Sequence, residues 1–255
     1  MIPKDPEELI APAREGTLNV MRAAAAAKVE RVVQTSSSAA IFYGRDNPNG
    51  HVFNEEDWTD PGHSDNVPYT RSKTIAERAA WDELTKLPRP LDWVTVNPGL
   101  VLGPVLDKDV SASVELVAKM LRGELPGLPR LSGAIVDVRD IADLHLRAMI
   151  EPKAAGQRYI GAGEVLSLGQ MAEILRSEAG ELSAKVPTRA LPDWLVRLIG
   201  LFDKEVGGLV FELGKMRRLT SAKAMRELSW KSRPAAETIT ATARSLKAVG
   251  ALSTA

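Results

Sequence analysis

The chain has 255 residues, of which 44% are hydrophobic and 26% charged, a composition typical of a globular protein of one large domain with an added lobe. Its thirty-three basic residues balance thirty-three acidic ones, and this zero net charge argues against a nucleic-acid partner. Cysteine is absent, which excludes disulfides, thiolate nucleophiles and Cys-ligated zinc. The histidines, His51, His63 and His145, lack the spacing of a metal site, so we expect no metal.

The N-terminal segment does not resemble a signal peptide. Met1–Ile10 contains three acidic residues and no apolar core. No apolar run approaches the ~20 residues that cross a bilayer. We therefore expect a cytoplasmic protein with no membrane contact.

Helices and strands alternate in the predicted order of elements. A helix begins near Asp5-Pro6 and runs through the alanines at 23–27, and a strand follows at Arg31–Thr35. Residues 44–68, rich in Gly, Asn, Asp and Pro, predict a loop. The remaining predicted elements are a helix at Tyr69–Leu87, a strand at Leu91–Val96, a helix at 110–122, a strand at Ala134–Val138, a helix at Ile141–Ile150, a strand at Arg158–Ile160 and a helix capped by Ser167. This alternation predicts an α/β fold with a parallel sheet.

The pair Tyr69 and Lys73 carries the clearest chemical signal. Residues at i and i+4 share one helix face, and a neighbouring ammonium stabilises a phenolate against its ordinary pKa near ~10. Such a phenol can exchange a proton with a carbonyl oxygen during hydride transfer. The same spacing also occurs in ordinary surface helices, so the pair needs support from elsewhere.

Two polar segments follow predicted strands and provide that support. Ser36-Ser37-Ser38 comes after the strand at 31–35, and Asn97-Pro98-Gly99 comes after the strand at 91–96. Ligands of open α/β sheets bind at the carboxyl ends of the strands, where a hydroxyl can stabilise charge on a substrate oxygen. The alternatives are a helix cap for the serines and a plain turn for Asn97 through Pro104.

In this order the motifs resemble the extended short-chain dehydrogenase/reductases of the NAD-dependent epimerase/dehydratase family. The closest resemblance is to dihydroflavonol reductases, cinnamoyl-CoA reductases and related aldehyde and ketone reductases. Further similar segments are Glu56–Pro61, Ser72–Trp81, Val136–Ala142 and Ser221–Trp230. The resemblance implies a Rossmann-like parallel sheet, incomplete at the N-terminus, over residues 1–160. It also implies a small, mostly helical substrate lobe over 161–255, interleaved with 104–134.

The resemblance also implies site roles, residue by residue. Tyr69 matches the general acid/base, and Lys73 matches the residue that assists it and holds the nicotinamide ribose. Ser37 matches the serine that binds the carbonyl, with Ser36 and Ser38 as alternatives because the triplet permits a one-residue slip. The cofactor-binding stretch matches Pro98, Gly99, Leu100 and Val101.

The Gly-rich turn that holds the cofactor pyrophosphate in such proteins has no counterpart here. Gly161-Ala162-Gly163 lies far downstream, and we interpret it as a turn. Without the strands that precede this region in the family, the strand at 31–35 should form an open edge beside the strand at 91–96. The choice between NAD and NADP stays open because the residue that reads the 2′ position belongs to the same part.

The sequence therefore predicts an NAD(P)H-dependent reductase of an aldehyde or ketone, a small-molecule carbonyl substrate, with a homodimer as a family expectation. Two alternatives stay open. One is a sugar-nucleotide epimerase or dehydratase with the same fold, and the other is a catalytically inactive binding or interaction protein.

Overall fold

A computed structural model of the protein describes residues 5–45, 48–64 and 66–252, which fall into two compact units. The first unit comprises Met1–Pro98, Ala142–Gly161 and Leu219–Trp230. The second comprises Gly99–Ile141, Ala162–Arg218 and Lys231–Ala255. Each unit is therefore built from three separate stretches of the chain.

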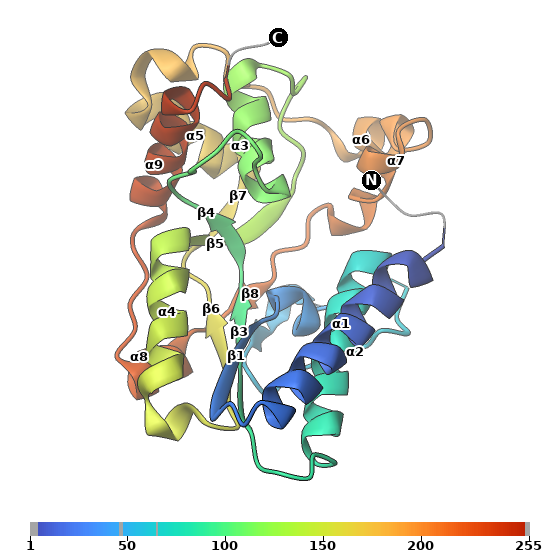
Figure 1. Cartoon of the computed structure of the whole chain (residues 1–255). Helices are drawn as coiled ribbons and strands as arrows, with labels where there is room; N and C mark the ends of the chain where they lie inside the picture. Colours follow the sequence, from blue (N-terminus) through green and yellow to red (C-terminus); the bar gives the residue numbers. More distant parts are fainter. Residues whose placement is uncertain (1–4, 46–47, 65, 253–255) are drawn as a thin grey trace. The chain divides into compact units, whose positions relative to one another are not determined.

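The first unit is built around a three-stranded parallel sheet of order β1-β3-β6. Its elements are α1 (Glu7–Ala26), β1 (Arg31–Thr35), η1 (Ser38–Ala40), η2 (Pro48–Gly50), β2 (Val52–Phe53), α2 (Pro68–Leu84), β3 (Asp92–Pro98), most of α4 (Val138–Ile150), η3 (Pro152–Ala154), β6 (Arg158–Gly161), the end of β8 (Arg218–Leu219) and α8 (Ala222–Leu228). Helices α1 and α2 cover one face of this sheet, and α4 and α8 lie on the other (Figure 1). The parallel α/β fold predicted from the sequence is confirmed.

The pairing of β1 confirms a second prediction. It runs parallel to β3 with Val33 opposite Val94, and β3 in turn pairs with β6 with Val96 opposite Tyr159. Within the described residues β1 pairs with no other strand, so it ends the sheet there. An apolar cluster in which Met21 of α1, Ala80 of α2 and the buried Trp93 of β3 pack together fixes the two helices on the sheet.

The second unit has a sheet of order β4-β5-β7, in which β4 and β5 are parallel and β5 and β7 antiparallel. Its elements are β4 (Leu100–Leu102), α3 (Ala112–Arg122), β5 (Ser132–Asp137), β7 (Val165–Ser167), α5 (Leu168–Glu178), η4 (Gly180–Ser183), α6 (Asp193–Ile199), α7 (Lys204–Gly207), η5 (Val210–Glu212) and α9 (Ala235–Ala248). Helices α3, α5 and α9 contribute most of its apolar core. Ser167 and Gln170 form the predicted capping box at the start of α5.

Three sequence predictions differ from the structure in detail. The segment 44–68 contains η2 and the short strand β2 besides loop. Residues 97–104 are not one turn: β3 extends to Pro98, and Leu100–Leu102 form β4, paired with β5. Residues Gly161–Gly163 lead into β7 before any helix begins. Periodicity cannot detect strands of two or three residues, because so short a run shows no repeat.

Gly163 is glycine for a steric reason. A Cβ at this position would lie 2.8 Å from the carbonyl oxygen of Ile135 on β5 and 2.5 Å from Ser232 Oγ. We therefore expect Gly163→Ala to reduce the free energy of unfolding by about 1–3 kcal/mol, measured by urea denaturation. The matched control is Gly16→Ala in α1, where nothing lies within 4 Å of the added methyl. That substitution should stabilise by about 0.5–1 kcal/mol, and a Gly163→Ala variant as stable as wild type would contradict the steric account.

No helix in the described part of the chain is long and apolar enough to cross a membrane.

Candidate active site

Tyr69 and Lys73 lie in the first two turns of α2. Pro68 starts the helix, and the Val67 amide donates to Thr70 Oγ1 at 3.1 Å, which ties down the helix start. The Lys73 ammonium lies 5.8 Å from the centroid of the Tyr69 ring. The Tyr69 side chain is exposed, at 51% of its accessible surface. The structure therefore brings the phenol and the ammonium together at a position that a ligand can reach.

The three serines after β1 lie in different surroundings. Ser36 is buried and its hydroxyl donates to the Glu77 carboxylate. Ser38 is also buried and lies within η1. Ser37 is only half-buried, and its Oγ accepts from the Ala39 amide at 3.1 Å. A hydroxyl that accepts this bond keeps its own proton for donation, so Ser37 is the serine best suited to bind a ligand.

The structure also relates the serines to α2, which carries Tyr69 and Lys73. The turn η1, which begins directly after Ser37, packs against α2 and against β3. All of these elements belong to the first unit. The Asn97 side chain at the end of β3 donates to the Ser37 carbonyl at 3.1 Å. Ser37, Tyr69 and Lys73 therefore lie in the same unit, on or next to elements that pack against each other.

The stretch Pro98, Gly99, Leu100 and Val101 joins the two sheets. Pro98 ends β3 opposite Gly161, whereas Leu100 and Val101 lie in β4 opposite Ile135 and Val136. A Cβ at Gly99 would lie 2.4 Å from the Ala134 carbonyl oxygen, so only glycine fits there. Part of this backbone is therefore engaged in a β-ladder and not in an open turn. That these four residues contact a cofactor stays a prediction.

A second tyrosine also has a lysine nearby, but its surroundings differ. Tyr159 is fully buried, its hydroxyl donates to Glu227 Oε2 at 3.1 Å, and Lys223 Nζ lies 5.1 Å from its ring centroid. Burial raises the pKa of the Tyr159 phenol, and the neighbouring Glu227 raises it further. A phenol that is buried and held protonated cannot exchange protons with a ligand, so Tyr69 is the better acid/base candidate.

Glu77 and Arg158 form a buried ion pair that the sequence did not predict as part of the site. Arg158 Nε donates to Glu77 Oε1 at 2.7 Å, and the Glu77 side chain is fully buried. Glu77 follows Lys73 by one turn of α2, between the buried Ala76 and Ala80. The sequence contained one signal of this pair: Glu77 is a charged residue among the apolar residues of the helix, and a charge that is buried requires a partner.

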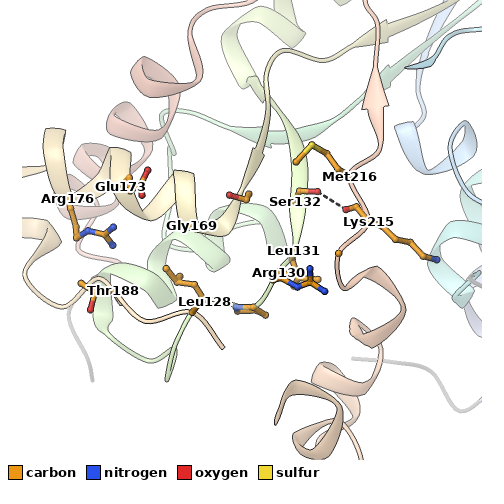
Figure 2. Close-up of a pocket in the computed structure, with 14 residues that line it drawn as sticks. Leu128, Arg130, Leu131, Ser132, Gly169, Glu173, Arg176, Thr188, Lys215 and Met216 are labelled. Carbon is orange, nitrogen blue, oxygen red and sulfur yellow. Dashed lines mark hydrogen bonds between the residues drawn. The ribbon is translucent and has the colours of Figure 1, made fainter. Parts of the chain in front are cut away.

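A pocket of about 390 Å³ lies in the second unit. Figure 2 shows that its walls come from residues 128–132, the first turns of α5 and residues 214–216. The Ser132 hydroxyl donates to the Lys215 carbonyl at 2.8 Å and so joins two of these wall segments. Leu131 and Met216 add apolar surface, and Arg176 adds a cation. The lining therefore suits a small molecule with both apolar and polar groups.

A pocket of about 470 Å³ in the first unit contains Glu55 and Lys223. Burial raises the pKa of the Glu55 carboxyl, although the Ile160 amide, which donates to it at 3.0 Å, lowers it. A raised carboxyl pKa means that the folded state holds its proton more tightly than the unfolded state. Stability that is present below the unfolded pKa of about 4.3 is therefore lost as the pH rises through the folded pKa.

We expect Glu55→Gln to remove the loss of stability that the wild-type protein shows at this residue as the pH rises. The amide oxygen of Gln can still accept from Ile160, whereas the buried charge is gone. The variant should gain stability relative to wild type between about pH 4 and pH 7 and show no gain below about pH 4, measured as urea midpoints at each pH. A gain that falls as the pH rises would contradict the assigned direction.

Comparison with known proteins links this arrangement to a family of enzymes. Residues 3–163 match the model of the NAD dependent epimerase/dehydratase family. The cinnamoyl-CoA reductase 1 of Petunia hybrida is 40% identical over 173 residues, which cover 67% of this chain and 51% of that protein. An anthocyanidin reductase of Vitis vinifera is 34% identical over 200 residues, covering 72% of this chain and 58% of that one. The chain spans about half the length of the cinnamoyl-CoA reductases that it matches.

Solved structures agree with the sequence matches. The yeast methylglyoxal/isovaleraldehyde reductase Gre2, solved with NADPH, superposes with a TM-score of 0.78 at 30% identity. This superposition covers 98% of the present chain and 74% of the yeast enzyme. The structure of gox2253 gives a TM-score of 0.80 at 24% identity, over 99% of this chain and 77% of that one, and shows the fold alone. The Rossmann-like fold predicted from the sequence is thereby confirmed.

Proposed function

Since the chain belongs to the NAD dependent epimerase/dehydratase family, we propose that the protein is an NAD(P)H-dependent reductase of a small aldehyde or ketone. The observation that carries this proposal is the exposed Tyr69 phenol with the Lys73 ammonium 5.8 Å from its ring centroid. The reductases among its relatives and structural neighbours support the reductive reaction over the other activities of the family.

The roles of the three residues follow from their chemistry. Tyr69 donates its phenolic proton to the carbonyl oxygen of the substrate as the carbonyl carbon is reduced. Lys73 stabilises the phenolate that remains, and solvent returns the proton. Ser37 donates a hydrogen bond to the same substrate oxygen and stabilises the negative charge that develops on it.

The residues present fit the nicotinamide half of the cofactor. A phenol and an ammonium on one face of α2 are suited to hydrogen-bond the hydroxyls of a ribose. When bound, the reduced nicotinamide supplies the hydride for the carbonyl carbon. Within the described residues no Gly-rich turn links a parallel strand to a helix, so we assign only Tyr69, Lys73 and Pro98–Val101 to this cofactor and leave NAD and NADP as alternatives.

We propose the second unit as the substrate lobe. It contains most of the predicted lobe of 161–255 and 104–134, although residues 219–230 belong to the first unit. The pocket of Figure 2 supports this assignment because both stretches contribute to its lining. Leu131 and Met216 form the apolar part of this lining and Ser132 and Arg176 its polar part, which suits a small molecule with both kinds of group.

The experiment that tests the proposed function is a titration of the protein with NADPH and with NADH, followed by nicotinamide fluorescence. Turnover is then measured with a panel of aldehydes and ketones. Saturable binding and oxidation of the cofactor in the presence of a carbonyl compound would support the proposal. No binding up to millimolar cofactor would instead favour a non-catalytic binding protein. Binding without reduction, but with conversion of sugar nucleotides, would favour an epimerase or dehydratase.

A further inference from the structure

The Glu77 carboxylate is fully buried and is surrounded by four hydrogen-bond donors from three segments of the first unit. These donors are the Ser36 hydroxyl, the Thr95 hydroxyl at 3.2 Å, the Asn97 amide at 2.7 Å and Arg158 Nε at 2.7 Å. Glu77 thus binds the ends of β1 and β3 and the start of β6 to the catalytic helix.

Asn97 connects this carboxylate to the candidate active site. Its Nδ2 donates to Glu77 Oε2 at 2.7 Å and to the Ser37 carbonyl at 3.1 Å. An amide nitrogen has two hydrogens, so both bonds can form at once. The Asn97 side chain is fully buried, and its amide is therefore held without competition from solvent.

Arg158 places a cation directly beside this carboxylate. Its guanidinium stacks on Trp58, 3.6 Å from the ring centroid, and donates to the carbonyls of Glu55 at 2.6 Å and Asp57 at 3.0 Å. The cation is thereby fixed from three sides beside Glu77. Because Arg158 holds the Glu77 carboxylate in one orientation inside the protein, the oxygen that accepts from Asn97 also has a fixed position.

We propose that Asn97, oriented by Glu77, is a positioning residue for Ser37. The bond to the Ser37 carbonyl fixes the peptide plane that follows Ser37, whose backbone is extended at φ −160° and ψ 150° before the chain enters η1. Fixing that plane orients the Cα–Cβ bond of Ser37 and the start of η1, whose Ala39 amide donates to Ser37 Oγ at 3.1 Å and so holds the hydroxyl. The role rests on the proposed function, in which the Ser37 hydroxyl binds the substrate carbonyl, because a small displacement of such a group reduces turnover sharply.

The test compares Asn97→Ala with Thr95→Val. Thr95 lies on the same strand and donates to the same carboxylate, and its side chain makes no hydrogen bond to Ser37 that the structure records. Its hydroxyl also lies 3.4 Å from Asn97 Oδ1, a longer contact than either bond that Asn97 Nδ2 donates. Valine has nearly the shape of threonine, so this control removes the donor to Glu77 and that long contact but keeps both Asn97 Nδ2 bonds, to Glu77 and to the Ser37 carbonyl. Ser36→Ala is a second control, because it removes a donor to the Asn97-bound oxygen of Glu77.

Two readouts separate positioning from a general loss of structure. The first is the carbonyl ¹³C chemical shift of Ser37, which should change in Asn97→Ala and stay in place in Thr95→Val. The second is turnover: kcat should fall on the order of 10- to 100-fold in Asn97→Ala, with an unchanged Kd for NADPH, whereas Thr95→Val and Ser36→Ala keep most of the wild-type kcat. Equal losses in Asn97→Ala and both controls, or no loss in any of them, would overturn the proposal.

The same experiments distinguish a failure of the proposed function from a failure of the positioning role of Asn97. A wild-type protein that reduces no carbonyl compound would contradict the reductase assignment, while the Ser37 carbonyl shift and the Ser37 side-chain coupling constants would still decide whether Asn97 orients Ser37. Should Asn97→Ala not fold, Asn97→Ser is the second variant, because its short hydroxyl cannot reach both partners. An unchanged Ser37 shift in either variant would overturn the proposal.

Discussion

Replacing Tyr69 by phenylalanine should abolish nearly all carbonyl reduction while the fold stays intact. The substitution removes one exposed hydroxyl from the face of α2 and leaves the ring in place. The proton that the substrate oxygen needs would then have no positioned donor. General acid catalysis of this kind contributes on the order of 10²- to 10⁴-fold, so kcat in a cofactor-oxidation assay should fall by that factor. The melting temperature should stay close to that of wild type.

Tyr159→Phe is the matched control for this loss. It deletes the hydroxyl of the other tyrosine that has a lysine beside its ring, but that hydroxyl is bound to Glu227 inside the first unit. We expect reduced stability and wild-type turnover. Lys73→Met should also lose turnover, as Tyr69→Phe does, because the Tyr69 phenolate would then lack its neighbouring cation. Full activity in Tyr69→Phe would show that another group supplies the proton.

The largest effect on stability should come from Arg158→Met. This substitution leaves the Glu77 carboxylate buried without its cation, and also removes the stacking on Trp58. Breaking one side of a buried ion pair costs about 3–5 kcal/mol, measured as the free energy of unfolding in urea. The cost arises because the carboxylate cannot regain water inside the protein.

Arg22→Met is the control for a general effect of removing arginine. Arg22 also forms a salt bridge, at 2.7 Å to Glu83, but its side chain is half exposed. Its loss should cost much less than the loss of Arg158, because a salt bridge exposed to solvent contributes little to stability. The double variant Glu77→Gln with Arg158→Met should recover part of the loss, because no unpaired charge then remains. Equal costs for Arg158→Met and Arg22→Met would contradict the buried-pair account.

Local sequence patterns predicted the order of the main elements well. The helix predicted at Tyr69–Leu87 and the strand predicted at Arg31–Thr35 could be recognised because local features of the sequence indicate them. These features are the spacing of apolar residues in the helix and the run of β-branched residues in the strand. The strands β4 and β7 were missed because each has three residues and is held by its partner β5. Their existence depends on contacts between distant segments, which no local pattern contains.

The same distinction applies to the site. Tyr69 and Lys73 are four residues apart on one helix, so their proximity is a local property that the sequence reveals. The Glu77 carboxylate, in contrast, accepts from residues as many as 81 positions away in the chain. Glu77 is one turn from Lys73 in sequence, and a charged residue on a helix ordinarily faces solvent. Only the fold shows that this one is buried and bonded to Asn97, which donates to the Ser37 carbonyl.

A crystal structure of the protein with NADP⁺ and a bound alcohol product would measure the geometry of Ser37, Tyr69 and Lys73 around the reacting oxygen. We predict that the alcohol oxygen lies within about 3.2 Å of both the Tyr69 phenol oxygen and Ser37 Oγ, with Lys73 Nζ close to the phenol. An alcohol oxygen bound away from Ser37 Oγ and the Tyr69 phenol, or a Lys73 side chain turned into solvent, would contradict the reductase assignment.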